Sequence, residues 1–237
     1  MKRNIKKVLI LGLNNVGNKI ARKLSSHVKN LKIIKKKIAL KEIHKYNPDI
    51  IFSLGYRFII PDEVINYPKY GCYNIHKSML PLNKGANPVF WTILNNTTAG
   101  ISIHKVSSKI DSGQVYEQKK IIYDFSFNAK KLYEKMENEQ FKQFFIFWKK
   151  LKNSKEKPKK VSIKKTSLHK KKDFQKMMIS KSLQNKGIKN FINLLRASTF
   201  PPFNNIKIKD KKKVYKLELV ITEINSKKKR YGFVKSY

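Results

Sequence analysis

Short apolar runs alternate with amphipathic segments along the first two thirds of the chain. A short apolar run bounded by turn residues is typical of a buried strand, and apolar positions about 3.6 residues apart are typical of a helix. Strands are expected at 7–11, 31–34, 48–55, 71–76, 100–106 and 115–122, and helices from a turn at 12–17 through about 25, then at 38–46, 61–65, 87–94 and 128–151. Because strands and helices alternate, the pattern predicts an α/β fold with a mostly parallel sheet.

The pattern changes after residue 152. Residues 153–172 are rich in lysine and contain Pro158, which predicts a solvated linker. A helix is expected around 189–196, and two strands at 214–224 and 230–234 are expected to form a hairpin. The chain is therefore divided into a main domain at 1–152, a linker at 153–172 and a small C-terminal α+β subdomain at 173–237.

The composition is that of a folded protein with a strong positive charge. The chain has 237 residues, of which 41% are hydrophobic, and this is enough for a sizeable core. The net charge is +39, yet only five of the 54 basic residues are arginine. A nucleic-acid groove would use arginine more often, so compositional drift of the whole proteome is the favoured interpretation. The charge would still attract an anionic substrate.

Several classes of protein do not fit the sequence. The apolar runs are too short to cross a bilayer, and the N-terminus lacks the cleavage pattern of a signal peptide. The glycines at 12 and 17 do not match a dinucleotide-binding pattern, and no metal site is expected. The single cysteine, Cys72, cannot form an internal disulfide, which favours a reducing cytoplasm.

The candidate chemistry lies on the strand at 71–76. Asn74 and His76 are two residues apart, so on a strand they project from the same face, and Asp111 follows on a later loop. An amide donor, an imidazole and a carboxylate together suit acyl transfer to an amine. Each of these residues alone would more often be a cap, a turn or a core residue.

Five short motifs resemble one family. The motifs are Gly55-Tyr56, Tyr73-Asn74-Ile75-His76, Ser78-Met79-Leu80-Pro81, Gly85-Ala86 and Asp111-Ser112-Gly113. In this order they resemble the N10-formyltetrahydrofolate-dependent formyltransferases, from about residue 50 to 118. The resemblance implies a Rossmann-like formyltransferase domain and the transfer of a formyl group from N10-formyltetrahydrofolate to an amine.

The resemblance also implies residue roles. Asn74 and His76 would stabilise the tetrahedral oxyanion, and Asp111 would keep His76 protonated and help to remove the amine proton. Separately from the resemblance, the strand parity that His104 shares with Ser102 favours a structural or supporting role for His104. The loop that would hold the folate, largely through its backbone, contains Leu54, Gly55, Tyr56 and Ile59, with Arg57 as a further candidate.

Three features favour a nucleotide-linked amino sugar, expected to be dTDP-linked, as the acceptor. The strings at 83–91 and 191–203 resemble segments of the sugar N-formyltransferases, and little chain follows the second, whereas methionyl-tRNA formyltransferase normally carries a larger C-terminal domain. Phe200 and Phe203 could stack on a nucleobase. The candidate substrate contacts are Ser78, Lys84, Trp91, Arg196, Phe200 and Phe203.

Other acceptors stay open at this point. A trimmed methionyl-tRNA formyltransferase would use the positive charge to bind tRNA. A glycinamide ribonucleotide formyltransferase and an inactive relative that serves as a binding protein are further alternatives. Two departures from the family pattern, Lys77 in place of a proline and Asn87 in place of a histidine, bear on the acceptor. A homodimer is a possible assembly, and no membrane partner is expected.

Overall fold

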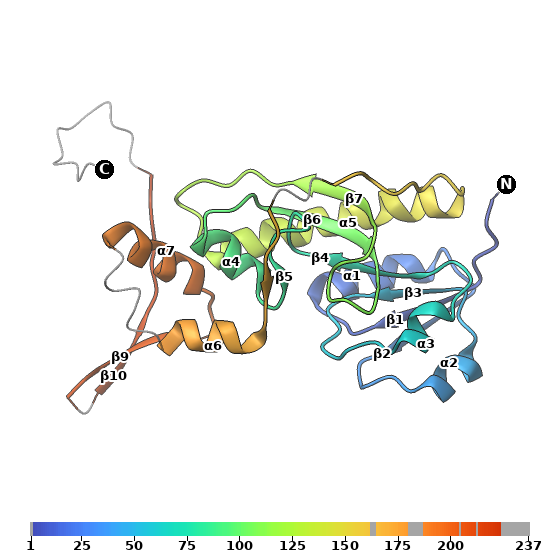
Figure 1. Cartoon of the computed structure of the whole chain (residues 1–237), viewed down its shortest axis with the longest axis horizontal. Helices are drawn as coiled ribbons and strands as arrows, with labels where there is room; N and C mark the ends of the chain where they lie inside the picture. The colour runs from blue at the N-terminus through green and yellow to red at the C-terminus, as the bar shows by residue number, and fades with distance from the viewer. Residues whose placement is uncertain (1, 162–164, 180–186, 204, 212, 224–237) are drawn as a thin grey trace.

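The computed structural model describes residues 2–161, 165–179, 187–203, 205–211 and 213–223. The N-terminal strands with α2 and α3 lie at one end of the long axis in Figure 1, and α6, α7 and a hairpin lie at the other. The long helix α5 runs between the two ends. Within the described ranges, no helix combines the length and the apolar character needed to cross a bilayer.

A six-stranded sheet forms the centre of the molecule. The strands are β1 (Lys7–Leu11), β2 (Asn30–Ile34), β3 (Ile50–Ser53), β4 (Cys72–His76), β6 (Gly100–Lys105) and β7 (Val115–Lys120). Their order is β2-β1-β3-β4-β6-β7. The first four strands are parallel, and β6 and β7 are antiparallel to their neighbours. The predicted mostly parallel α/β sheet is confirmed.

Helices cover both faces of the sheet. They are α1 (Asn15–Ser25), α2 (Leu40–Tyr46), α3 (Asp62–Asn66), α4 (Pro88–Leu94) and α5 (Ala129–Lys152). The side chains of Asn14 and Asn128 accept a backbone N–H in the first turns of α1 and α5, which is typical of helix N-caps. Pro88 suits the start of α4 because its missing N–H would have no partner there.

The alternation along β4 decides where the polar residues lie. Tyr73 and Ile75 pack against α5 in a core that includes Phe144 and Phe147. Cys72 belongs to a second core, on the opposite face, which α2 and α3 cover. Because side chains alternate, Asn74 and His76 share the face of Cys72. The polar pair therefore lies on the face of the sheet opposite α5.

The C-terminal helices share a core with the main domain. They are α6 (Lys171–Ile179) and α7 (Ile188–Ser198). Leu194 and Ala197 of α7 are buried with Phe90 of α4 and Met136 of α5. Phe174 of α6 packs edge-on against Phe90, with ring centroids 4.9 Å apart. The domain boundaries given above stay a prediction.

The predicted C-terminal hairpin has a different pairing. Strand β10 (Lys213–Leu217) ends earlier than expected, and it pairs with β9 (Ile206–Asp210). The pairing with 206–210 was not predicted; this segment lies directly before β10, across a turn in which Lys211 adopts a positive φ of 51°. The segment 230–234 lies outside the described residues.

The expectation of a solvated linker at 153–172 is wrong for part of this stretch. Its lysines are mostly exposed, but Glu156 pairs with Arg3, and α6 begins at Lys171. A short strand β8 (Leu168–His169) pairs in parallel with β5 (Lys84–Gly85). The pattern could not reveal β5 and β8 because each has only two residues, which backbone pairing alone defines.

Candidate active site

Strands β4 and β6 place four polar side chains together. Asn74 stands opposite His104, and His76 stands opposite Ser102, so these residues share one face of the sheet. Asp111 comes from the loop after β6 and adopts a positive φ of 44°, a conformation that aspartate tolerates better than most residues. The loop thereby folds back over the strand pair.

The Asp111 carboxylate lies at the centre of this group. Its Oδ2 is 3.4 Å from His76 Nδ1, and its Oδ1 is 3.3 Å from His104 Nε2. Asn74 Nδ2 donates to Oδ1 (3.2 Å), and the backbone N–H of Gly85 donates to Oδ2 (2.8 Å). The structure thus brings together Asn74, His76 and Asp111, as predicted from the sequence.

The hydrogen bonds of His76 define its tautomer. Its Nε2 lies 2.8 Å from the carbonyl oxygen of Asn83. Since a carbonyl oxygen only accepts, Nε2 carries a hydrogen. The second ring nitrogen, Nδ1, faces Asp111. Nδ1 is therefore the position at which His76 gains or loses a proton.

Burial decides the charge of the pair. It lowers the pKa of His76 by more than Asp111 and the Asn83 carbonyl raise it, which favours the neutral ring. Burial alone would raise the pKa of Asp111, but His76, His104 and the Gly85 N–H lower it well below its usual range. That Asp111 keeps His76 protonated stays a prediction, since the carboxylate raises the pKa of the ring while burial lowers it.

His104 fixes the orientation of Asn74. Its Nδ1 donates to the carbonyl oxygen of Lys105 (3.0 Å), and its Nε2 lies 3.2 Å from Asn74 Nδ2 and 3.3 Å from Asp111 Oδ1. The Asn74 amide nitrogen therefore lies within hydrogen-bond distance of both His104 and Asp111. The sequence offered one signal for this role, since His104 is a polar residue that shares the strand parity of Ser102.

Asn83 is a residue whose role the sequence did not reveal. It is fully buried and has a positive φ of 52°. Its Nδ2 donates to the hydroxyls of Thr92 (3.0 Å) and Thr97 (2.8 Å). Asparagine is favoured where the backbone turns with positive φ, and the adjacent Lys84-Gly85 fits such a turn, but this signal concerns the turn and not the carbonyl that meets His76.

Three predicted substrate contacts lie around this group. Lys84 is closest, since its Nζ donates to Ser112 Oγ (3.1 Å) beside Asp111. Ser78 is fully buried, and its hydroxyl has no hydrogen-bond partner among the described atoms. Trp91 donates to the Ala86 carbonyl and is 4% exposed. Contacts of these side chains with a substrate stay a prediction, and for Ser78 and Trp91 the structure shows only surroundings within the protein.

The loop expected to hold the folate follows β3. The Leu54 carbonyl accepts the N–H of Asn14, and the Tyr56 hydroxyl accepts the N–H of Ile38. Gly55 has a positive φ of 79°, and a β-carbon there would meet the Asn14 side chain at 2.9 Å. Ile59 is 80% exposed. The loop thus lies beyond the carboxyl ends of β1 and β3, where open α/β sheets bind ligands.

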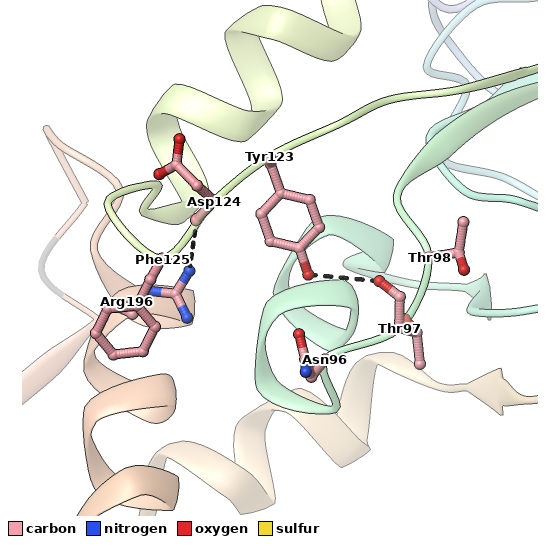
Figure 2. A pocket seen from close by; sticks show the side chains of 7 residues that line it. All are labelled: Asn96, Thr97, Thr98, Tyr123, Asp124, Phe125 and Arg196. Atoms are coloured by element: carbon pink, nitrogen blue, oxygen red, sulfur yellow. Dashed lines mark hydrogen bonds between the residues drawn. The ribbon is translucent and has the colours of Figure 1, made fainter. Parts of the chain in front are cut away.

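Arg196 lies beside a separate cavity of about 320 Å³ (Figure 2). The side chain is 5% exposed, and its three nitrogens donate to Phe127 O, Asn193 Oδ1 and Asp124 O. These bonds brace α7 against the chain after β7, and contact with a phosphate stays a prediction. The cavity is lined by Asn96, Thr97, Thr98, Tyr123, Asp124, Phe125 and Arg196.

Phe200 and Phe203 follow α7 and lie close together. Their ring centroids are 5.9 Å apart. Phe200 packs on Tyr133, whereas Phe203 is 61% exposed. Phe203 is therefore the ring of this pair that a ligand can reach. Among the described residues, no group of three or more histidine, cysteine, aspartate or glutamate side chains is arranged to hold a metal ion.

Comparison with known proteins identifies the family. The family described as Formyl transferase matches residues 17–146, which is more than half of the chain. The chain belongs to the formyl transferase family, as its motifs predicted. Methionyl-tRNA formyltransferase of Wolbachia pipientis subsp. Culex pipiens (strain wPip) is 39% identical over 104 residues, which are 44% of this chain and 35% of that protein. The chain therefore matches about a third of the length of this curated relative.

Two solved structures extend the comparison. A sugar N-formyltransferase from Shewanella sp. FDAARGOS_354 has a TM-score of 0.80 at 21% identity, over 93% of this chain and 99% of that one, and shows the fold alone. The formyltransferase PseJ from Anoxybacillus kamchatkensis is 28% identical, with a TM-score of 0.67, over 79% of this chain and 97% of that one. It was solved with UDP-4,6-dideoxy-4-formamido-L-AltNAc and tetrahydrofolate. The predicted Rossmann-like formyltransferase fold is confirmed.

Proposed function

We propose that this protein transfers the formyl group of N10-formyltetrahydrofolate to the amine of a nucleotide-linked amino sugar. The observation that carries the proposal is the cluster around Asp111, where an imidazole, a carboxylate and an amide meet. Membership of the formyl transferase family supports the reaction class. The folate supplies the formyl group and recovers a proton at N10 when the carbon leaves.

His76 manages the proton in this proposal. Its neutral Nδ1 accepts a proton from the attacking amine as the new carbon–nitrogen bond forms. The imidazolium that results lies 3.4 Å from Asp111, which stabilises a charge absent from the resting state. Asn74 lies beside His76 and donates to the formyl oxygen, where negative charge develops, once one of its two N–H groups turns away from His104 or Asp111. His76 then returns the proton to the leaving nitrogen.

The residues present fit a folate and an anionic acceptor. The loop at 54–59 presents an exposed Gly55 and Ile59 at the carboxyl ends of β1 and β3. Phe203 offers an exposed ring for a nucleobase, and the net charge of +39 attracts a pyrophosphate. The likeness to PseJ, solved with a UDP-linked formamido sugar, supports a nucleotide sugar as acceptor. Our proposed carrier is dTDP.

A turnover assay on an acceptor panel tests the proposal. The panel contains amino sugars linked to dTDP and to UDP, and methionine-charged initiator tRNA. We expect formylated sugar nucleotide in the wild type and none with His76→Ala. Formyl product on the tRNA alone would overturn the sugar assignment, and product on none of the acceptors would overturn the reaction itself.

Methionyl-tRNA is the second candidate acceptor, because the curated relative from Wolbachia that formylates it is 39% identical over the matched residues. The +39 charge would then bind phosphates, and binding would weaken steeply as salt is added. A titration of initiator tRNA over a salt series distinguishes the two acceptors. Tight binding with a steep salt slope favours tRNA, and weak binding favours the sugar.

We further propose a cytoplasmic location and a homodimer. The buried free thiol of Cys72, the single cysteine, supports a reducing compartment. Light scattering of the purified full chain measures the mass, and that of a monomer would refute the dimer.

A further inference from the structure

The loop at 81–86 connects the candidate catalytic pair to a distant part of the chain. We propose that Ser167 is a positioning residue of the reaction, because its hydroxyl holds Asn83 in place and the Asn83 carbonyl holds His76. This inference rests on the proposed function, because the reaction that Ser167 would support is the proposed formyl transfer. The contacts behind it stand independently of that function.

The Ser167 hydroxyl makes two bonds to Asn83. The Asn83 N–H donates to Ser167 Oγ at 2.7 Å, and Oγ donates in turn to Asn83 Oδ1 at 3.2 Å. One hydroxyl thus uses its acceptor and its donor on the same residue. The backbone carbonyl of Ser167 also accepts the N–H of Lys84 at 2.9 Å. Both the backbone and the side chain of Asn83 are fixed from this side.

The same loop also holds Asp111, the partner of His76. The N–H of Gly85 donates to Asp111 Oδ2, and Gly85 pairs with His169 in the β5–β8 ladder. The N–H of Ala86 donates to the His169 carbonyl at 2.8 Å. His76 and Asp111 are therefore each bonded to the backbone of one loop, whose outer edge is held by β8 and the residues before it.

Removal of the hydroxyl would release Asn83. This residue is fully buried, so its N–H and Oδ1 would lose partners that water cannot easily replace. Its positive φ of 52° is a conformation that persists only when the surroundings impose it. A shift of the Asn83 carbonyl would free Nε2 of His76, and the tautomer of a histidine is set by the bond that its other nitrogen makes. Nδ1 would then no longer be reliably free to accept a proton.

The test replaces the hydroxyl in the full chain. We expect Ser167→Ala to lower kcat about thirtyfold while KM changes less than about threefold, since a small misplacement of a catalytic group mainly affects the chemical step. Ser167→Thr keeps the hydroxyl and should restore most of the rate. Ser25→Ala is the matched control, because Ser25 is an exposed serine on α1 whose hydroxyl bonds only the Arg22 carbonyl among the described residues. It should leave the rate unchanged.

A second measurement does not depend on turnover. Nitrogen NMR of the histidine rings reports which nitrogen of His76 carries the hydrogen and how the ring titrates. In the wild type the hydrogen should stay on Nε2, whereas Ser167→Ala should show a mixture of tautomers and a lower His76 pKa, since the Asn83 carbonyl raises that pKa. Unchanged tautomer and titration in the variant would overturn the inference, even if the rate falls. If Ser167→Ala does not fold, Ser167→Cys takes its place with the same criteria, because a thiol keeps the shape and hydrogen-bonds weakly.

The two proposals fail in different ways. If the wild type formylates no acceptor while His76 changes tautomer in Ser167→Ala, the proposed function fails and the positioning role stands. If the wild type turns over and Ser167→Ala matches it in rate and in ring titration, the positioning role fails alone.

Discussion

Replacement of Asp111 by asparagine isolates the role of one charge. The amide keeps the size of the carboxylate, and asparagine tolerates the positive φ of 44° at this position, so the loop should survive the change. The variant removes the negative charge that lies 3.4 Å from His76 Nδ1. Asp111→Asn should therefore affect the step in which His76 becomes positive.

The distance sets the expected size of the effect. Two unit charges at 3.4 Å interact by about 5 kcal/mol at an effective dielectric constant of about 20. The side chains are only 9% and 12% exposed, so solvent screens this pair weakly. We expect kcat to fall about a thousandfold, which corresponds to about 4 kcal/mol of transition-state free energy. The loss should appear in kcat rather than in KM, because the imidazolium forms only during the reaction.

Single-turnover formyl transfer, measured across the range in which histidine titrates, provides the assay. The reaction needs neutral His76, so the rate should fall as the pH drops through the pKa of that ring, which burial has lowered. Asp111 raises this pKa, so its removal should move the acid limb to lower pH. Asp62→Asn, the same change at an exposed position on α3, is the control. A rate within about tenfold of the wild type, or an acid limb that moves to higher pH, would refute the mechanism.

Three further predictions concern other parts of the structure. Burial lowers the pKa of Lys77 to about 8 from an ordinary 10.5, so its ammonium destabilises the fold at neutral pH. Relative to Lys77→Met, the free energy of unfolding of the wild type should rise by about 3 kcal/mol as the pH increases from the lowered to the ordinary pKa of Lys77. In this pH range the unfolded state binds more protons than the folded state. Gly85→Ala should lower the free energy of unfolding by about 2–4 kcal/mol and abolish most turnover, because the new β-carbon would fall against the His169 carbonyl at a positive φ of 85°. Phe203→Ala should raise KM for the sugar nucleotide about tenfold and leave kcat and the melting temperature unchanged, because its exposed ring is available to stack on a base.

Each of these predictions has a matched control and an outcome that contradicts it. The control for Lys77→Met is Lys35→Met, which removes an exposed lysine. If the free energy of unfolding depends on pH in the same way in the wild type and in Lys77→Met, Lys77 does not carry a buried charge. The control for Gly85→Ala is Gly187→Ala, where φ is also positive, at 83°, and no described atom lies within 4 Å of the new β-carbon. Equal losses of stability and turnover in the two variants would exclude the clash with the His169 carbonyl. Tyr215→Ala removes an exposed ring from β10, and an equal rise in KM there would exclude stacking on Phe203.

The sheet was predictable because its strands are apolar runs that the core requires. The strands at 7–11 and 50–53 are buried almost throughout, and such segments stand out in any sequence. Helix α6 was missed because its lysine-rich start continues the composition of the preceding stretch. Its helical state depends on the packing of Phe174 against Phe90, which only the folded chain provides.

Only the side-chain part of the candidate site was predictable from the sequence. Asn74, His76 and Asp111 have a distinctive chemistry and spacing, so motif and strand parity identified them together. The contributions of Asn83 and Gly85 come from a backbone carbonyl and a backbone N–H, which every residue possesses. The resting charge of His76 depends on burial, which no spacing of residues reveals.

The β5–β8 ladder has a consequence for synthesis on the ribosome. Asn83 leaves the ribosome 84 residues before the serine that holds it. At a synthesis rate of about 5–20 residues per second, the loop waits roughly 4–17 seconds for its partner strand. The nascent sheet can form during that interval, but the imidazole and the carboxylate acquire their final geometry only after Ser167 and His169 have emerged. Catalytic competence therefore arises later than the sheet as this polypeptide is made.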